Sequence, residues 1–140
     1  MKLVIDASVA MGWLVAMEGV LDVSSLLTEK NELIAPDLIF PEVSNAVWRL
    51  VHGGYLSREQ GPVIVKQLAN TIDKILPCAP LAEAATAISL ELKHPAYDCF
   101  YLALAARELA PMVTVDKRLL NKLIGTSYEA LAVYPGNLTI

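Results

Sequence analysis

Residues 1–10 read MKLVIDASVA, an apolar run interrupted by a single carboxylate. Leu3, Val4 and Ile5 have the composition of a short strand that is buried on both faces. Asp6 follows them directly, and small residues come after it. An acid at the end of a buried strand can cap the next helix, because aspartate is a favoured N-cap. It can also belong to a functional site at the edge of a sheet, and the rest of the chain has to distinguish the two.

The length and composition limit the class of protein. With 140 residues, the chain is expected to form a single domain over 1–140 with a sizeable core. Its hydrophobic content is 55%, yet the charge-free stretch 7–17 is shorter than the roughly 20 residues that span a bilayer. Asp6 also interrupts any signal peptide, so we expect a cytoplasmic protein with no membrane partner. A net charge of −4 argues against a generally basic, nucleic-acid-coating surface.

Short apolar strands alternate with helices along the chain. Strands are expected at 2–6, 32–35, 73–77, 111–116 and 130–134, and helices at 8–17, about 20–29, 41–54, from a capped turn at 57–60 to about 70, 81–94, 96–110 and 117–125. Ser8 and Asp22 are candidate caps of the first two helices. The alternation predicts an α/β fold, a three-layer sandwich with a mainly parallel central sheet of about 4–5 strands flanked by helices.

Four carboxylates fall at expected strand C-termini or helix N-termini, namely Asp6, Glu42, Asp98 and Asp116. Each alone has a local explanation as a helix cap or as a first-turn acid that complements the helix dipole. These ends converge on one edge of a parallel sheet, however, where two carboxylates about 4 Å apart repel by about 4 kcal/mol at an effective dielectric near 20. A divalent cation would compensate this charge. The set contains no histidine or cysteine, so Mg²⁺ or Mn²⁺ is expected.

Other polar residues accompany the acids. Ser8 and Thr114 lie two residues from Asp6 and Asp116, and their hydroxyls could hold the metal ligands; for Ser8, helix capping is the alternative. Glu42, Asn45 and Arg49 share one helix face and could extend from metal to phosphate. A solvated polar stripe is the alternative for Asn45 and Arg49.

The acids in their sequence context resemble a known signature. VIDAS with Asp6, PEVSNAVWRL with Glu42, YDCFYLALA with Asp98 and VTVDKRL with Asp116 resemble, in this order, the motifs of PIN-domain ribonucleases, and most closely the VapC-type toxins of toxin–antitoxin pairs. The resemblance implies Mg²⁺-dependent endonucleolytic cleavage of single-stranded RNA, with Mn²⁺ as a substitute. Asp6 and Asp98 would bind the metal most directly, and Glu42 and Asp116 would complete the site.

The resemblance also implies partners. Arg49, Lys117 and Arg118 are candidate contacts to RNA phosphates, although exposed basic side chains are usually only solvated. A homodimer is expected, and so is an antitoxin peptide bound along a groove near the acids. The aromatic and leucine side chains that form either the core or these contacts, with the core expected for each, are Trp13, Trp48, Tyr101 and Leu102.

Other functions remain open at this stage. A PIN nuclease can serve in RNA processing outside a toxin–antitoxin pair, and the chain could be a catalytically silent protein-binding module. Receiver-like and haloacid-dehalogenase-like domains are disfavoured, since KILPCAP ends in no acceptor aspartate and Ser8 stands where a dehalogenase has its second acid. RNase H-like nucleases begin with an antiparallel meander, whereas a helix is expected after Asp6.

Overall fold

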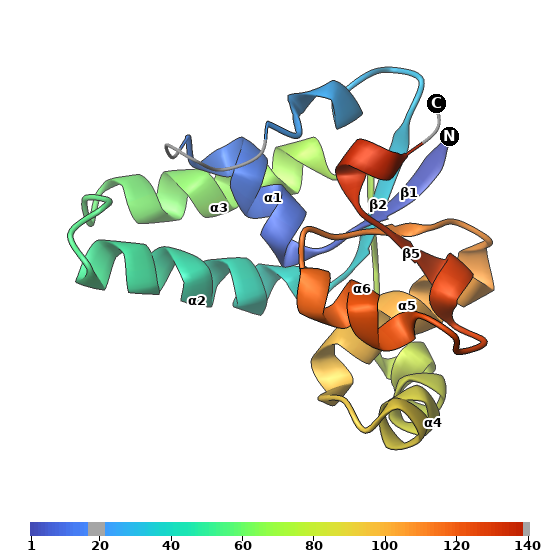
Figure 1. Ribbon diagram of the computed structural model, residues 1–140. Helices are drawn as coiled ribbons and strands as arrows, with labels where there is room; N and C mark the ends of the chain where they lie inside the picture. Colours follow the sequence, from blue (N-terminus) through green and yellow to red (C-terminus); the bar gives the residue numbers. More distant parts are fainter. Residues whose placement is uncertain (17–21, 139–140) are drawn as a thin grey trace.

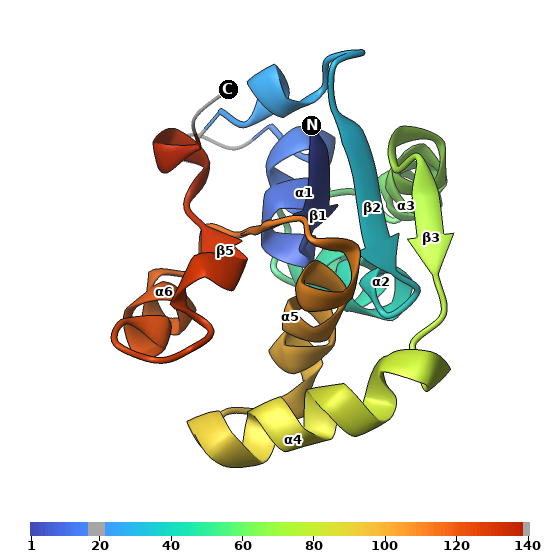
Figure 2. The ribbon, with the colours of Figure 1, turned by 90° about the vertical axis from the view of Figure 1, so that its right-hand side faces the viewer.

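The computed structural model describes residues 1–16 and 22–138 and contains a five-stranded parallel sheet. Its strands are β1 (Lys2–Ile5), β2 (Glu32–Pro36), β3 (Lys74–Leu76), β4 (Met112–Val113) and β5 (Ala132–Val133), in the spatial order β3-β2-β1-β4-β5. Every neighbouring pair is parallel. Figure 2 shows β1, β2 and β3 side by side and pointing the same way. The predicted α/β class and parallel sheet are confirmed.

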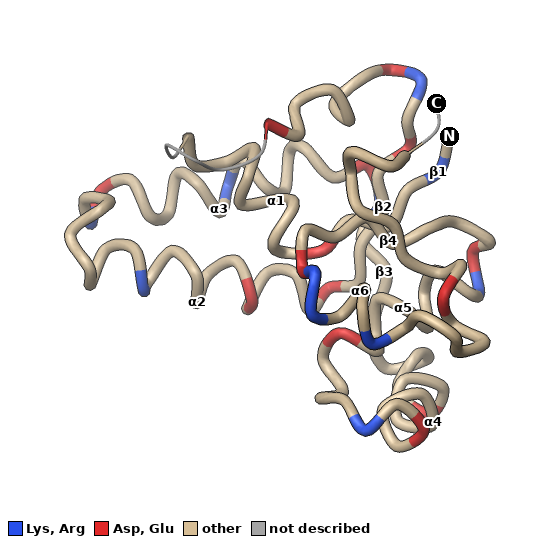
Figure 3. Tube along the Cα trace, viewed as in Figure 1, with Lys and Arg blue, Asp and Glu red and all other residues tan. Residues whose placement is uncertain are grey.

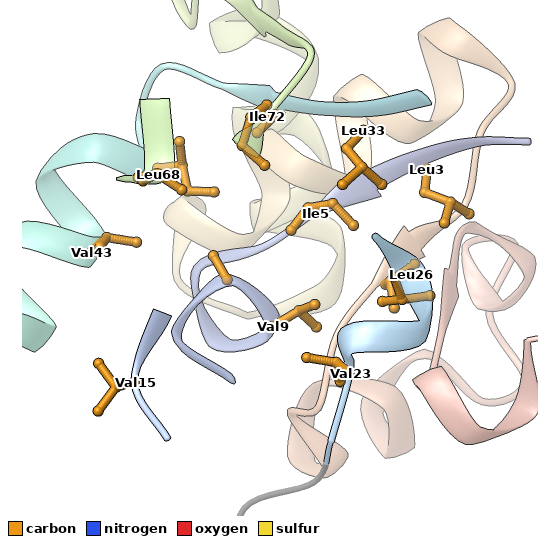
Figure 4. Packing of buried hydrophobic residues seen from close by; sticks show 14 of the residues in the cluster. Leu3, Ile5, Val9, Val15, Val23, Leu26, Leu33, Val43, Leu68 and Ile72 are labelled. Carbon is orange, nitrogen blue, oxygen red and sulfur yellow. The ribbon is translucent and has the colours of Figure 1, made fainter. Parts of the chain in front are cut away.

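Helices cover both faces of this sheet (Figure 1). They are α1 (Ala7–Leu14), α2 (Ile39–His52), α3 (Gln60–Thr71), α4 (Ala82–Leu92), α5 (Ala96–Glu108) and α6 (Lys117–Leu123). Successive side chains of a strand point to opposite faces, and β1 shows this directly. Leu3 and Ile5 pack with α1, α2 and α3, as Figure 4 shows, whereas Val4 packs with α4, α5 and α6. Two hydrophobic cores therefore sandwich the sheet.

The opening strand occupies the middle of the fold. β1 pairs with β2 on one side and with β4 on the other, and Leu3, Val4 and Ile5 are fully buried. An apolar run without alternation is what a strand covered on both faces requires. The C-terminal ends of parallel strands share one edge of the sheet, which is where ligand sites form in this class. Asp6 lies at that edge, at the end of a central strand.

The predicted helix at about 20–29 is wrong where the structure describes it. Residues 20 and 21 lie outside the described residues, and 22–29 contains only the 3₁₀ turn Ser24–Leu26. Side chains take the backbone groups that an α-helix would use: Trp13 Nε1 donates to the Val23 carbonyl at 2.7 Å, and Asn31 Nδ2 donates to the Leu26 carbonyl at 3.1 Å. Such local bonds compete with helix formation.

The helix caps differ in part from the prediction. Asp6 is the N-cap of α1, because its Oδ1 accepts a hydrogen bond from the Val9 amide at 2.9 Å. The capping role considered for Asp6 is therefore confirmed, and the one considered for Ser8 is wrong. Asp22 accepts a bond from the Ser24 amide within a turn rather than capping a helix. The reciprocal capping box is confirmed, with bonds between Ser57 and Gln60 in both directions.

The predicted core residues are mostly confirmed. Tyr101 and Leu102 are buried, and Trp13 packs against the first core cluster. Trp48 was expected in the core, but it is 60% exposed and stacks on His52. Val47 takes the inward position on α2, and the next residue is rotated by about 100° away from the core. None of the described helices combines the length and the apolar character needed to cross a membrane.

Candidate active site

Asp6 is the most buried of the four acids. Its side chain leaves β1 and is fixed at the start of α1, with Oδ1 accepting bonds from the Val9 amide at 2.9 Å and the Ser8 hydroxyl at 2.7 Å. The residue is only 6% exposed. Burial raises the pKa of Asp6 to about 6, because desolvation disfavours the charged form. Hydrogen bonds from Thr114, Ser8 and Val9 oppose this rise, and the nearby charge of Asp98 adds to it.

Glu42 enters the same region from the first turn of α2. The Tyr101 hydroxyl, which comes from α5, donates a hydrogen bond to Glu42 Oε1 at 2.6 Å. Desolvation raises the pKa of Glu42; the bond from Tyr101 opposes this and the charge of Asp98 adds to it. Two elements separated by almost half the chain are thereby joined at the site.

Asp98 lies in the first turn of α5. Its Oδ2 is 2.6 Å from His94 Nε2, and the side chain is 31% exposed. His94 is itself fixed from α4, since the Ser89 hydroxyl donates to its carbonyl at 2.6 Å. Desolvation is the main cause of the raised pKa of Asp6 and of Glu42, and the charge of Asp98 adds to both, so Asp98 lies within electrostatic range of each of them.

Two hydroxyls connect β1 with the segment after β4. Thr114 is fully buried; it donates to Asp6, and its Oγ1 accepts a bond from the Asp116 amide at 3.1 Å. Ser8 donates to Asp6, and its Oγ accepts from the Val115 amide at 3.3 Å. These hydroxyls thus link Asp6 to the backbone around Asp116, and their support of metal ligands stays a prediction.

Asp116 caps a helix, as Asp6 does. It is the N-cap of α6, and its Oδ1 accepts bonds from the Arg118 and Leu119 amides at 3.0 and 3.1 Å. It lies at the same sheet edge as Asp6, because β1 and β4 are paired in register up to Ile5 and Val113. Figure 3 shows an acidic position toward the N-terminal end of α2 and basic positions at the start of α6. The structure therefore places Asp98 within electrostatic range of both Asp6 and Glu42, while Asp116 lies at the sheet edge of Asp6, at the start of α6.

The donor set can be tested against a divalent cation. Among residues 1–16 and 22–138, no three His, Cys, Asp or Glu side chains form a ready-made metal cage. Mg²⁺ does not require one, because it keeps several waters and is bound through one or two carboxylates together with substrate phosphates. Within the described residues, Asp6, Glu42 and Asp116 have no ion pair with Lys or Arg. A buried carboxylate at Asp6 and partly buried ones at Glu42 and Asp116, none of them paired with a Lys or Arg of the described residues, fit this metal.

A groove begins beside Glu42 and follows α1 and α2. Its first part, about 240 Å³, is lined by Ser8, Glu42, Asn45 and Arg49 among others. The predicted alignment of Glu42, Asn45 and Arg49 on one helix face is thus confirmed. Beyond it lie a more apolar cleft of about 390 Å³ and a larger one of about 840 Å³. The clefts share residues in turn: Ser8, Met11, Ala46 and Arg49 between the first two, and Val15 and Tyr55 between the second and third.

The other predicted phosphate contacts lie on the rim. Lys117 and Arg118 are exposed at the start of α6, directly after Asp116. The Lys117 ammonium is 5.2 Å from the centre of the Tyr134 ring, in a cation–π contact. These two side chains are therefore accessible, but the cleft beside Glu42 is lined by Arg49 and by neither of them.

Two residues of the site were missed by sequence reasoning. His94 was treated only as the end of a helix, and Tyr101 as a core residue. A signal was present for Tyr101 only, since it follows Asp98 by three residues and shares its helix face. His94 lies before the start of α5, so helical spacing did not connect it with Asp98. What no spacing could show is that the Tyr101 hydroxyl meets Glu42, which is 59 residues away.

The PIN domain family matches residues 3–123, a range that contains all four acids. Ribonuclease VapC3 of Pyrobaculum aerophilum is 31% identical over 125 residues, covering 87% of this chain and 95% of that protein. A match of this length and identity indicates common family membership and not only a shared fold.

Solved structures agree. The crystal structure of PAE2754 from Pyrobaculum aerophilum has a TM-score of 0.72 at 24% identity, and covers 97% of this chain and 90% of that one. VapBC2 from Rickettsia felis, bound to a DNA fragment from their promoter, has a TM-score of 0.69 at 13% identity, with coverage of 96% and 98%. The resemblance seen in the four acidic motifs is confirmed, and the chain belongs to the PIN domain family.

Proposed function

We propose that this chain is a metal-dependent endoribonuclease that cleaves single-stranded RNA, and that it is the toxin of a toxin–antitoxin pair. One observation carries the nuclease proposal: Asp98 lies within electrostatic range of both Asp6 and Glu42, and desolvation together with this charge raises the pKa of those two acids. The name of its relative, Ribonuclease VapC3, supports RNA as the substrate. The whole chain, 1–140, is taken as one nuclease domain.

The roles of the acids follow from their environments. Asp6 and Asp98 would hold Mg²⁺, or Mn²⁺ in its place, and Glu42 and Asp116 would complete the site directly or through oriented waters. When bound, the cation supplies positive charge at the scissile phosphate and Lewis acidity for the attacking water. Ser8 and Thr114 fix Asp6 through hydrogen bonds. Asn45 and Arg49, which line the adjoining cleft, would orient the RNA backbone.

The groove suggests how an antitoxin would bind. It leads from the acids, past Met11 and Val15, to the exposed side chains of Tyr55 and Val63. An antitoxin segment with apolar side chains fits its far part, and a basic residue at the near end would face the acids. The structural neighbours named as VapBC and FitAB support a paired antitoxin, and a homodimer is part of the same proposal.

Metal removal tests the nuclease proposal. Adding EDTA to the purified protein is expected to lower the initial rate of cleavage of a fluorogenic single-stranded RNA by about 10²-fold, since the cation supplies charge that no Lys or Arg provides. Excess Mg²⁺ or Mn²⁺ should restore the rate, and Ca²⁺, which prefers more ligands at longer distances, should restore less. Cleavage at an equal rate with EDTA and with Mg²⁺ would contradict a metal-dependent mechanism.

Expression tests the toxin assignment separately. Induction of the chain in a bacterial host is expected to arrest growth, and co-expression of the small protein from a neighbouring gene should relieve the arrest. Viable-cell counts after induction provide the measurement, with Asp98→Asn as the inactive control. If the protein cleaves RNA in vitro but its expression is harmless, a role in RNA processing replaces the toxin role; if it does neither, the silent binding module gains.

A further inference from the structure

A tyrosine hydroxyl lies beneath the acidic site. Tyr101 is 1% exposed, and its Oη donates to Glu42 Oε1 at 2.6 Å. It belongs to α5 one turn after Asp98, so one helix carries both an acid of the site and the group that holds another acid. Most of its surroundings are apolar, because α5 also buries Leu102 and Leu104. The hydroxyl is therefore a polar group deep in the structure, directed to a single carboxylate.

The charge state of this hydroxyl is fixed by its neighbours. Burial raises the pKa of Tyr101 far above its ordinary value, and the charges of Glu42, Asp6 and Asp98 raise it further. The direction of the bond follows from its geometry, because the hydroxyl lies 2.6 Å from Glu42 Oε1 and a carboxylate oxygen accepts from a phenol. Asp6 and Asp98 lie within electrostatic range of the same hydroxyl.

Glutamate needs such a support more than aspartate does. Its longer side chain has more rotatable bonds, so ordering its carboxylate costs more conformational entropy. Asp6 is fixed by Ser8 and by a backbone amide, and Asp98 contacts His94, whereas Glu42 has Tyr101. A bond on Oε1 leaves Oε2 available to a cation or to a water that the cation holds. Groups that orient metal ligands in this way tune metal affinity.

We propose that Tyr101 is a positioning residue of the nuclease site, which holds Glu42 in the rotamer that completes the cation site with Asp6 and Asp98. This inference rests on the metal-dependent function proposed above. The alternative is that Glu42 serves only as the hydrogen-bond partner that a buried tyrosine hydroxyl requires, with no effect on the cation site. The chain provides a matched comparison for that alternative: the Tyr128 hydroxyl also donates to a glutamate, Glu91, but on the exposed surface.

Mn²⁺ binding to the RNA-free protein tests the inference. Electron paramagnetic resonance gives the Mn²⁺ dissociation constant for the wild type, Tyr101→Phe and Tyr128→Phe. Tyr101→Phe keeps the ring and removes the hydroxyl, so we expect Mn²⁺ binding about tenfold weaker, as for other groups that orient a metal ligand. Tyr128→Phe should bind as the wild type does. Tyr101→Phe added to Glu42→Gln should weaken binding further by less than about twofold, because the tyrosine acts through the glutamate.

The outcomes are distinguishable. If the wild type binds Mn²⁺ and folded Tyr101→Phe binds it equally well, the positioning role is overturned. If the wild type itself binds no Mn²⁺, the metal-dependent function fails, and the inference fails with it. Glu42→Asp covers the case in which Tyr101→Phe does not fold. This variant keeps the charge but is one methylene too short to reach the hydroxyl, and wild-type Mn²⁺ affinity in it would also overturn the role.

Discussion

Asp6→Asn is expected to lower the kcat/KM of RNA cleavage by about 10³-fold or more, corresponding to about 4 kcal/mol of lost transition-state stabilisation. The amide keeps the size of the side chain and an oxygen that can accept the bonds from Ser8 and from the Val9 amide. It removes the negative charge on which cation binding depends. The initial rate at saturating Mg²⁺, measured on a fluorogenic single-stranded RNA, provides the test.

A matched control separates charge at the site from charge elsewhere. Asp22 is also an aspartate that accepts a backbone amide bond, from Ser24, but it lies in an exposed turn. Asp22→Asn should therefore cleave RNA at the wild-type rate. Full activity in Asp6→Asn, with its fold verified by circular dichroism, would remove Asp6 from the proposed metal site.

The same substitution is expected to make the metal-free protein more stable. Burial raises the pKa of Asp6 from 3.8 to about 6. Ionising this group in the folded state therefore costs on the order of 3 kcal/mol more than ionising it in the unfolded chain. A neutral asparagine avoids that cost and still caps α1, since asparagine is as good an N-cap as aspartate. Urea denaturation in EDTA at pH 7.5 should show Asp6→Asn to be more stable by as much as about 3 kcal/mol.

The pH dependence gives the sign of the effect. As the pH falls through about 6, the folded carboxyl of Asp6 takes up a proton while the unfolded one, near 3.8, remains ionised. The folded wild type therefore gains stability relative to its unfolded state on acidification, and Asp6→Asn has no such gain. The difference between the two proteins should shrink to about a third of its neutral value at pH 4.5.

Added metal should act in the opposite direction. Mg²⁺ at neutral pH is expected to stabilise the wild type, because a ligand that binds the folded state shifts the unfolding equilibrium, and to leave Asp6→Asn unchanged. An Asp6→Asn protein that is less stable than the wild type in EDTA at pH 7.5 would show that the hydrogen bonds of the carboxylate outweigh its desolvation. The stability difference in EDTA and the stabilisation by Mg²⁺ thus both report on the same buried charge of Asp6.

The succession of strands and helices along the chain was largely predictable from local sequence pattern. The run Leu3-Val4-Ile5 indicated a strand covered on both faces, and such strands occur in parallel sheets between two layers of helices. The helix starts were less predictable. Ser8 and Asp6 are both good capping residues, and only the structure shows that Asp6 takes the amide bond while Ser8 bonds to Asp6.

The predicted helix at 20–29 failed for a related reason. Propensity describes what a segment does alone, whereas this segment is held by side chains from outside it. Trp13 and Asn31 take the carbonyls of Val23 and Leu26, and those bonds depend on where α1 and β2 place the two side chains. Trp48 shows the same limit, because its residue type favours the core and its position on α2 faces away from it.

The sequence by itself determined the α/β class and the position of the four acids at strand C-termini or helix N-termini, because these depend on periodicity and on residue type. In a parallel sheet such ends share one edge, so the sequence also indicated where a site would form. Only the tertiary structure decided which acids lie near one another. It placed Asp98 within electrostatic range of Asp6 and of Glu42, made Asp6 and Asp116 the N-caps of α1 and α6, and brought His94 to Asp98 and Tyr101 to Glu42. Desolvation and hydrogen bonds between residues far apart in sequence arise only from packing, so no local pattern contains them.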